Sequence, residues 1–373
     1  MTNKHLEHAL WLYNETTDNK SEIARRIKKE YGLEQSINSI RKRVARYIKR
    51  QESKGLVDEC EEVGIPVDKV KHYWYKGKHY SINVKGENGV SYDEIRDELI
   101  DEMKEHAPEY PTIVRQKVVD GHLLVVDPAD IHIGKLATSL ETGEEYNSQI
   151  AVQRVKDGVQ GILDKSEGFN IDKILFVAGN DILHIDTPDR KTTKGTPQDT
   201  DGMWYENFLV AKRLYVEVVE MLLAIADVHF VFNPSNHDYT NGFFLADTIS
   251  TWFMNCANIT FDVSINHRKY YRYGNNLIGT THGDTGKLAD LPLLMAQEAN
   301  DDWAKAKHKY IYTHHVHHKM SKDHIGVTVE SLRSPSGTDG WHHRQGYAHA
   351  PKAVEGFVHH KTHGQVARIT HLF

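Results

Sequence analysis

The sequence predicts an α/β core preceded by a small all-α N-terminal domain. Five runs of β-branched and aromatic residues, of the kind that form buried strands, lie between residues 123 and 312. Each run is followed directly by a short polar cluster rich in Asp, His and Asn. In residues 1–54, by contrast, apolar positions recur with helical spacing. A chain of 373 residues is longer than one ordinary domain, so we expect more than one.

Residues 1–54 form a basic head, with 13 Lys and Arg against 7 Asp and Glu. Because the whole chain has a net charge of −6, the head's +6 leaves −12 for the remainder. Ser21 and Ser36 can each cap a helix, and Gly32 can end one. The three expected helices span His5–Asn14, Glu22–Tyr31 and Ile37–Gln51.

The second and third of these helices, joined by a Gly-containing turn, resemble a helix-turn-helix. The third has an apolar face and an opposite face of polar and basic side chains, which can reach phosphates or base edges. An inert or protein-docking helical head stays open as the alternative. The expected DNA-binding residues are Asn38, Arg41, Lys42 and Arg46.

Residues 55–121 are expected to link this head to the core. Val70–Val84 predicts two short strands around a Lys-Gly-Lys turn, and Tyr92–His106 predicts a helix. The aromatic and lysine side chains of the hairpin could stack bases, as single-strand platforms do. An aromatic hairpin that packs on the core is the alternative. Pro108 and Pro111 then break the chain before the first core strand.

Composition indicates a soluble globular protein, with 39% hydrophobic residues and a mean hydropathy of −0.57. No stretch approaches the roughly 18 apolar residues of a membrane span, and the N-terminus has no signal-peptide core. The two cysteines, Cys60 and Cys256, allow neither a disulfide framework nor a Cys-based zinc motif. A cytoplasmic location is therefore expected.

The five polar clusters indicate a metal centre. They follow strands, and open α/β sheets bind ligands where their strands end. Asp, His and Asn are ligands for divalent ions, and two ions about 3.5–4 Å apart can clamp both oxygens of a phosphoryl transfer. An isolated His at a strand end is more often a surface or hydrogen-bonded residue, but five clusters together favour a dinuclear hydrolase site. The clusters are Asp130–His132, Gly179–Asp181, Asn236–Asp238, His282–Asp284 and His315–His317.

The order and spacing of these clusters resemble the calcineurin-like metallophosphoesterase superfamily. Its pattern of D-x-H, G-D or G-x-D, G-N-H-D, a lone His and G-H-x-H recurs here in order. Ser235 and His314 stand where the family usually has Gly, which questions loop geometry rather than the ligands. The spacing of Asp181 and His184 is similar to the DNA-repair exonuclease branch. The N-terminal module resembles phage-type versions of this core, which would place the protein in the host cytoplasm.

This resemblance implies the fold and a ligand set. The fold would be a two-sheet α/β sandwich over residues 122–373, after the 1–54 head and the 55–121 linker. Asp181 would bridge two divalent ions, most simply Mn²⁺, with Zn²⁺, Fe²⁺ or Mg²⁺ as alternatives. The first ion would be completed by Asp130, His132 and His317, and the second by Asn236, His282 and His315.

The resemblance further implies a mechanism. A metal-bound hydroxide would attack phosphorus while His237, as general acid, protonates the leaving oxygen. Asp238 would orient and charge that imidazole, and His184 would contact the scissile phosphodiester. The expected function is a phosphodiester hydrolase, foremost an exonuclease-like DNA nuclease with DNA as its partner. A homo-oligomer and an ATPase partner stay open.

Two other classes of function also stay open. One is a small-molecule or nucleotide phosphodiesterase or phosphatase. The other is a non-enzymatic DNA-binding regulator with a retired core, although every expected ligand is present.

Two further segments are expected to lie at the site. The polar stretch of residues 186–203 follows His184 directly and should cover the metals, although a plain disordered lid is the alternative. Its Arg190, Lys191 and Lys194, together with Lys287, are the expected substrate-binding residues. The turn-rich loop of residues 334–341 should also line the cleft. The stretches 327–332 and 367–373 predict strands of the second sheet, and most histidines of residues 308–373 stay unassigned.

Overall fold

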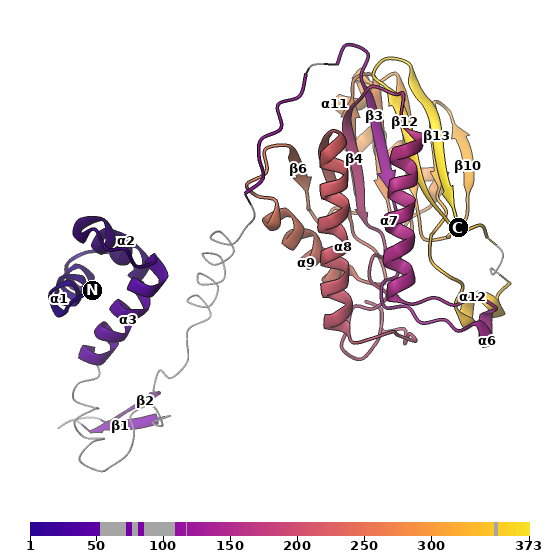
Figure 1. Cartoon of the computed structure of the whole chain (residues 1–373). Helices are drawn as coiled ribbons and strands as arrows, with labels where there is room; N and C mark the ends of the chain where they lie inside the picture. The colour runs from indigo at the N-terminus through magenta and orange to yellow at the C-terminus, as the bar shows by residue number, and fades with distance from the viewer. Residues whose placement is uncertain (53–71, 77–80, 86–108, 117, 347–349) are drawn as a thin grey trace. The chain divides into compact units, whose positions relative to one another are not determined.

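The structure is a computed structural model that describes residues 1–52, 72–76, 81–85, 109–116, 118–346 and 350–373 (Figure 1). The chain divides into two compact units, Met1–Ile100 and Asp101–Phe373, which are considered separately here. The expected α/β sandwich and all-α head are both confirmed. In the part of the chain that the structure describes, no helix is long and apolar enough to cross a membrane.

Three helices make up the head. They are α1 (Asn3–Glu15), α2 (Lys20–Tyr31) and α3 (Ile37–Glu52). Their apolar faces share one core, in which Ile23, Ile40 and Val44 are fully buried. Gly32 ends α2 in the left-handed conformation, as predicted. The predicted Ser21 cap is wrong.

Asn19 caps α2 because its side chain accepts hydrogen bonds from the backbone of Ser21 and Glu22. Ser36 does cap α3, accepting from the Ser39 amide at 3.2 Å.

The predicted hairpin strands are also present. β1 (His72–Lys76) and β2 (Ser81–Lys85) pair antiparallel. The turn between them, and the helix predicted at residues 92–106, lie outside the described residues.

A six-stranded sheet carries the first three polar clusters. Its order is β13-β12-β3-β4-β5-β6, with β3 to β6 parallel and β12 antiparallel to both neighbours. The strands are β3 (His122–Asp127), β4 (Ile171–Gly179), β5 (Asp227–Asn233), β6 (Ile259–Asp262), β12 (Ala353–His360) and β13 (Gly364–Leu372).

A five-stranded sheet carries the other two clusters, in the order β10-β11-β9-β8-β7. Its strands are β7 (Arg268–Tyr273), β8 (Asn276–Thr281), β9 (His308–Thr313), β10 (Met320–His324) and β11 (Val327–Ser331). The strand predicted at residues 327–332 belongs here, as expected. The one predicted at 367–373 does not, because a tight hairpin holds β13 beside β12, which pairs with β3.

Helices cover both outer faces of this sandwich, and Figure 1 shows α7 and α8 in front of β3 and β4. On the six-stranded sheet lie α7 (Ser148–Lys165), α8 (Trp204–Ile225) and α9 (Tyr239–Trp252). The five-stranded sheet packs against α10 (Leu291–Glu298) and residues around α11 (Asn300–Lys305). The remaining short helices are α6 (Ser139–Thr142), η2 (Leu288–Asp290) and α12 (Gly340–Arg344).

The continuous apolar runs of the sequence follow from this layering. Successive side chains of a strand point to opposite faces. In β3, Leu124 and Val126 pack against the helices, whereas Leu123 and Val125 pack against the second sheet. Both faces are therefore dry, and every position of the run must be apolar.

Buried polar pairs hold the two sheets in register. Asn233 at the end of β5 exchanges two hydrogen bonds with Thr280 of β8, at 3.0 and 2.8 Å. The Tyr312 hydroxyl of β9 lies 2.9 Å from Nε2 of His359 in β12. Because a buried polar group without a partner destabilises the fold, these pairs favour one alignment of the sheets.

Candidate metal centre

All five polar clusters meet at one edge of the sandwich. They follow the carboxyl ends of β3, β4, β5, β8 and β9. The first three strands are parallel neighbours in one sheet, and the last two are parallel neighbours in the other. Their carboxyl ends therefore lie side by side, which brings together residues up to 187 positions apart in the chain.

One group of ligand atoms comes from Asp130, His132 and His317, whose donor atoms all lie within 4.8 Å of one another. Nε2 of His317 lies 3.3 Å from Oδ1 of Asp130 and 3.3 Å from Nε2 of His132. In a tetrahedral site with metal–ligand bonds of about 2.0–2.1 Å, neighbouring ligand atoms lie ~3.3–3.4 Å apart. The three side chains thus have the spacing of ligands to one ion.

A second group comes from Asp181, His282 and His315, again within 4.8 Å. Nε2 of His282 lies 3.3 Å from Oδ2 of Asp181 and 2.9 Å from Oδ1 of Asn236. The amide oxygen of Asn236 therefore joins this group as a fourth oxygen or nitrogen donor.

One carboxylate oxygen connects the two groups. Oδ2 of Asp181, which faces His282, also lies 3.9 Å from Nε2 of His132. The other oxygen of Asp181 accepts a hydrogen bond of 3.0 Å from the backbone amide of His237. The geometry thus supplies an oxygen between two ligand groups, as a bridged pair of ions requires.

The charge balance of the site fits cations. Asp130 and Asp181 are 0% and 1% exposed, and among the described residues no Lys or Arg pairs with either carboxylate. Burial lowers the pKa of His282, but the Asp181 carboxylate outweighs it and raises that pKa to about 9. Buried carboxylates need compensation, and divalent ions held by this donor set would provide it. The residues present therefore fit two such ions.

The backbone of the site is held in an unfavourable conformation. Of the eight non-glycine residues with positive φ in the described chain, six lie in the clusters. They are Asp130, His132, Asn180, Asp181, His315 and His317, with φ between 51° and 72°. Such conformations persist only where the surrounding structure enforces them, and they concentrate at functional sites.

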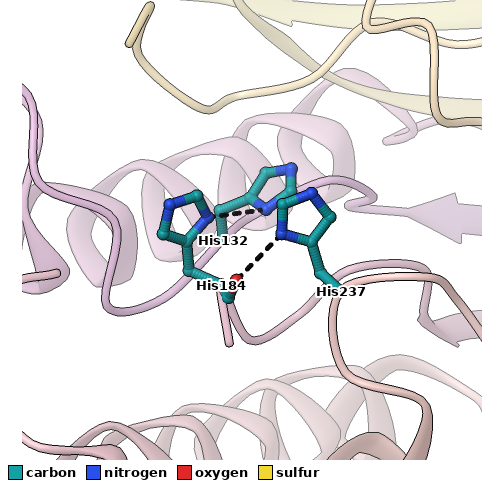
Figure 2. A group of neighbouring side chains, drawn as sticks. All are labelled: His132, His184 and His237. Carbon is teal, nitrogen blue, oxygen red and sulfur yellow. Dashed lines mark hydrogen bonds between the residues drawn. The ribbon is translucent and has the colours of Figure 1, made fainter. Parts of the chain in front are cut away.

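His237 lies beside the first group with its orientation set by the backbone. Its Nδ1 donates a hydrogen bond of 2.8 Å to the carbonyl oxygen of His184, and the two rings stack at 5.2 Å (Figure 2). His184 itself is 2% exposed, with Nδ1 3.3 Å from Nδ1 of His132. The three imidazoles therefore form a contiguous cluster next to the carboxylates.

The prediction that Asp238 orients His237 is wrong. The Asp238 carboxylate accepts from the hydroxyl of Ser235 at 2.6 Å and from the amide of Leu183 at 2.8 Å. Burial, with the Asp181 charge nearby, raises the pKa of Asp238 to about 7. Asp238 precedes α9 and turns toward these loops, so it supports the second and third clusters rather than the imidazole.

Ser235 and His314, the two residues that depart from the metallophosphoesterase-like pattern, both have hydrogen-bond partners. The Ser235 hydroxyl accepts a hydrogen bond of 2.7 Å from the amide of Asp181 and donates to Asp238. His314 is buried, with Nε2 2.9 Å from Oδ1 of Asp127 and Nδ1 3.0 Å from the carbonyl of Thr281. Each side chain ties a ligand loop to a strand end.

Two cavities open onto the centre. The larger, about 780 Å³, is lined by His132, His184 and the 337–340 loop, as expected for that loop. The smaller, about 180 Å³, is lined by Asn236, by His315 and by Thr192 and Lys194 of the 186–203 loop. His237 lines both. The 186–203 loop therefore lies beside the metal residues, and that it covers bound metals stays a prediction.

The expected substrate-binding residues are distributed unevenly. Lys194 lines the smaller cavity. Arg190, Lys191 and Lys287 are not among the residues that line either cavity, and Arg190 and Lys287 are exposed. Their contact with substrate remains a prediction.

Sequence reasoning missed the basic side chains of the larger cavity, Arg344 and Lys352. It also missed Lys135, which is 1% exposed and pairs with Asp339 at 2.9 Å beside this cavity. Burial lowers the pKa of Lys135. Asp339 in turn accepts from His342, whose ring stacks on the ligand candidate His317 at 5.1 Å. The one local signal was Lys135 itself, a lysine three residues after His132 of the D-x-H cluster.

In the head, the expected DNA-binding face lies opposite the core. Lys42 and Arg46 are exposed and Asn38 and Arg41 half-buried, whereas the opposite stripe of α3 is fully buried. The guanidinium of Arg41 donates to Asn38 at 3.1 Å. Lys42 and Arg46 are thus exposed among the described residues, and DNA as the partner of this face stays a prediction.

No protein-family model and no curated protein matches this chain. Solved structures that match include an archaeal phosphodiesterase, which is 7% identical and covers 68% of this chain and 99% of its own, with a TM-score of 0.32. Vps29 of Entamoeba histolytica with Zn²⁺ is 11% identical over 67% of this chain and 98% of its own, with a TM-score of 0.27. Vps29 of Chaetomium thermophilum is 11% identical over 67% and 98%, with a TM-score of 0.30. At these scores the likenesses carry no argument about function, which rests on the chain's own residues.

Proposed function

We propose that this chain is a dinuclear metal-dependent phosphoesterase that hydrolyses phosphodiesters. The observation that carries the proposal is the single Asp181 oxygen between two ligand groups, 3.3 Å from one imidazole and 3.9 Å from another. The five ordered clusters that resemble the calcineurin-like superfamily support it. When bound, a pair of divalent ions neutralises the phosphate oxygens and lowers the pKa of water.

The chain's own residues supply the remaining chemistry. Asp130 and Asp181 would hold the ions with the four imidazoles of the two groups and the Asn236 amide oxygen. His237 binds the His184 carbonyl through Nδ1–H, so Nε2 is the nitrogen left to carry a proton to the leaving oxygen. Its place on the walls of both cavities is suitable for a general acid.

DNA is the substrate that we favour, with exonuclease-like cleavage and Mn²⁺ as the ions. A cavity of about 780 Å³ exceeds the needs of one phosphate and has Arg344 and Lys352 on its wall. Lys194 lies in the other cavity, across the metal residues. Basic groups in both cavities could hold the phosphates that flank a scissile bond, and the basic head could add affinity for the strand.

A small phosphodiester or nucleotide is the second candidate substrate. Outside residues 1–54 the chain carries a net charge of −12, and Glu141, Asp199 and Asp339 also line the larger cavity. These carboxylates would repel a long polyanion more than a small ester.

The test is cleavage of end-labelled single- and double-stranded DNA with Mn²⁺, beside turnover of a chromogenic phosphodiester. Asp181→Ala is the matched inactive variant. DNA products that vanish with Asp181→Ala would support the nuclease. Chromogenic turnover without DNA products would move the substrate to small esters, and no turnover of either would overturn the enzyme proposal.

A further inference from the structure

We propose that His184 is a positioning residue that orients two other histidines, rather than a group that contacts the scissile phosphate. Its side chain sets which nitrogen of His132 carries the proton. Its backbone carbonyl determines in the same way which nitrogen of His237 carries a proton. The inference about His132 rests on the proposed metal centre, and the one about His237 rests on the hydrogen bond alone.

The argument begins with the two nitrogens of His132. A neutral imidazole has one N–H and one lone pair, and only the lone pair can bind a metal. Nε2 of His132 faces the first ligand group, 3.3 Å from Nε2 of His317 and 3.9 Å from Oδ2 of Asp181. His132 would therefore bind through Nε2 and carry its proton on Nδ1.

That proton needs an acceptor, because His132 is 2% exposed and has little access to water. Nδ1 of His184, at 3.3 Å, is the hydrogen-bond partner of this nitrogen within the described residues. His184 then accepts at Nδ1 and carries its own proton on Nε2. A ligating histidine that donates its other N–H to a fixed partner is the usual arrangement in metal sites.

The same residue orients His237 through its main chain. The carbonyl oxygen of His184 accepts from Nδ1 of His237 at 2.8 Å, and the rings stack with an interplanar angle of 21° (Figure 2). Nδ1–H of His237 is thereby held on this carbonyl, so Nε2 is the nitrogen that can take up and give a proton. Any side chain at position 184 keeps the carbonyl, so substitution separates the two effects.

The three imidazoles could instead hold an ion of their own, since their nitrogens lie within 4.8 Å of one another. The hydrogen-bonded arrangement is favoured for a simple reason. An ion in that place would need a second lone pair from His132, whose Nε2 already faces Asp181 and His317. A neutral imidazole has only one to give.

The experiment measures metal binding without substrate, by calorimetric titration of Mn²⁺ into the full chain. His184→Leu removes the acceptor, and we expect it to weaken one of two binding steps about 10–100-fold. His184→Asn places an oxygen near the position of Nδ1 and should recover most of that affinity. His237→Ala, which touches no proposed ligand role, should bind Mn²⁺ like the wild type.

A double-mutant cycle identifies the ion concerned. His184 is expected to act through the first ligand group, so its effect should disappear in a His317→Ala background and persist in a His315→Ala background. Equal far-UV circular dichroism and melting temperature of all variants would exclude misfolding as the cause.

Each other outcome overturns the inference in a distinct way. Unchanged Mn²⁺ affinity with a raised KM for His184→Leu would return His184 to a substrate contact. Three bound equivalents in the wild type, one of them lost with His184→Leu, would show an ion held by the three imidazoles. If the wild type bound no Mn²⁺ at all, the proposed metal centre would fail before His184 came into question.

Discussion

At the scale of single residues, the site depends on side chains that fix the ligands as much as on the ligands. Asp181 illustrates this dependence. Its side chain lies between two groups of imidazoles, while its own amide donates to Ser235 and its φ is 61°. Such a backbone conformation persists only because the surrounding structure enforces it, and this fixes the position from which the carboxylate projects.

Asp181→Asn should therefore lower activity more than loss of any imidazole. The amide is nearly isosteric but carries no charge, so both ligand groups would lose their shared anion. We expect binding of two Mn²⁺ equivalents to fall together, with turnover of a chromogenic phosphodiester reduced at least ~1,000-fold, about 4 kcal/mol of barrier. His315→Ala, at the edge of one group, is the control. A full second equivalent of Mn²⁺ in Asp181→Asn would contradict the bridging role.

Ser235 should contribute to stability through its side chain, which a glycine at this position would lack. Ser235→Ala removes the acceptor for the Asp181 amide and the donor to Asp238, both buried. We expect the free energy of unfolding to fall by about 1–3 kcal/mol, measured by chemical denaturation. Ser139→Ala, which removes only an exposed contact to Glu145 at 3.3 Å, is the matched control. A loss no larger than that of the control would show that other groups take over both hydrogen bonds.

At the scale of elements, buried polar pairs fix the positions of loops and strands, which apolar packing alone does not specify. The loop before α12 is held to the site by Lys135, whose ammonium pairs with Asp339 at 2.9 Å and donates to Ser336 at 3.1 Å. The two sheets are joined by Tyr312 and His359. Both links join segments more than 40 residues apart, so each closes a long stretch of chain.

Lys135→Met should lower the free energy of unfolding by about 3–5 kcal/mol, because it leaves the Asp339 charge partly uncompensated. The exposed pair of Lys156 and Glu217 provides the control. Lys156→Met removes the same kind of contact at 2.7 Å, but at the surface, and should change stability by no more than about 1 kcal/mol. Equal losses of unfolding free energy for the two variants would mean that burial does not make the Lys135 pair more important for stability than an exposed pair.

His359 should make the sandwich sensitive to acid. Burial lowers its pKa to about 3, against about 6.5 in an unfolded chain. As the pH falls from about 6.5 towards 3, His359 becomes protonated in the unfolded chain but stays neutral in the folded state. The free energy of unfolding therefore decreases over this range. His359→Gln, which keeps a partner for Tyr312, should flatten the pH dependence of denaturation in this range. An unchanged slope, equal to that of the exposed control His343→Gln, would contradict this assignment.

At the scale of the whole molecule, the chain combines a basic helical head with an acidic remainder that carries the candidate metal centre. Among the described residues, the core of the head is formed by the three helices with Met1 and Leu33. Its exposed basic face on α3 does not depend on the metal residues for its structure. The two units can therefore be tested separately within the full chain.

Replacing Arg41, Lys42 and Arg46 together by Glu should weaken DNA binding and reduce the slope of log affinity against log salt by about 3. Turnover of a small chromogenic phosphodiester should stay at the wild-type level, since the metal residues are untouched. The control replaces Lys305, Lys307 and Lys322, three exposed lysines of the second unit, by Glu. If both triple variants lost DNA affinity equally, the head would be an ordinary charged surface.

Much of the fold was readable from local patterns. The strands that carry the clusters are continuous apolar runs because both of their faces are buried. A run of four or five apolar residues is enough to reveal such a strand in the sequence. The buried stripe of α3 has the spacing of a helix and corresponds to the apolar face predicted for it. Cap assignment failed at Ser21, because two neighbouring polar residues compete and only the backbone geometry selects Asn19.

The sequence by itself determined the five strands that precede the clusters, the three helices of the head, and the residues that gather at the site, since each rests on residue type and short spacing. Only the tertiary structure decided which partner each of these residues has. Asp238 turns to Ser235 and Leu183, His237 to the carbonyl of His184, and Lys135 to a residue 204 positions away. Hydrogen bonds are short and directional, so a partner is chosen by the final position of the backbone, which no local pattern contains.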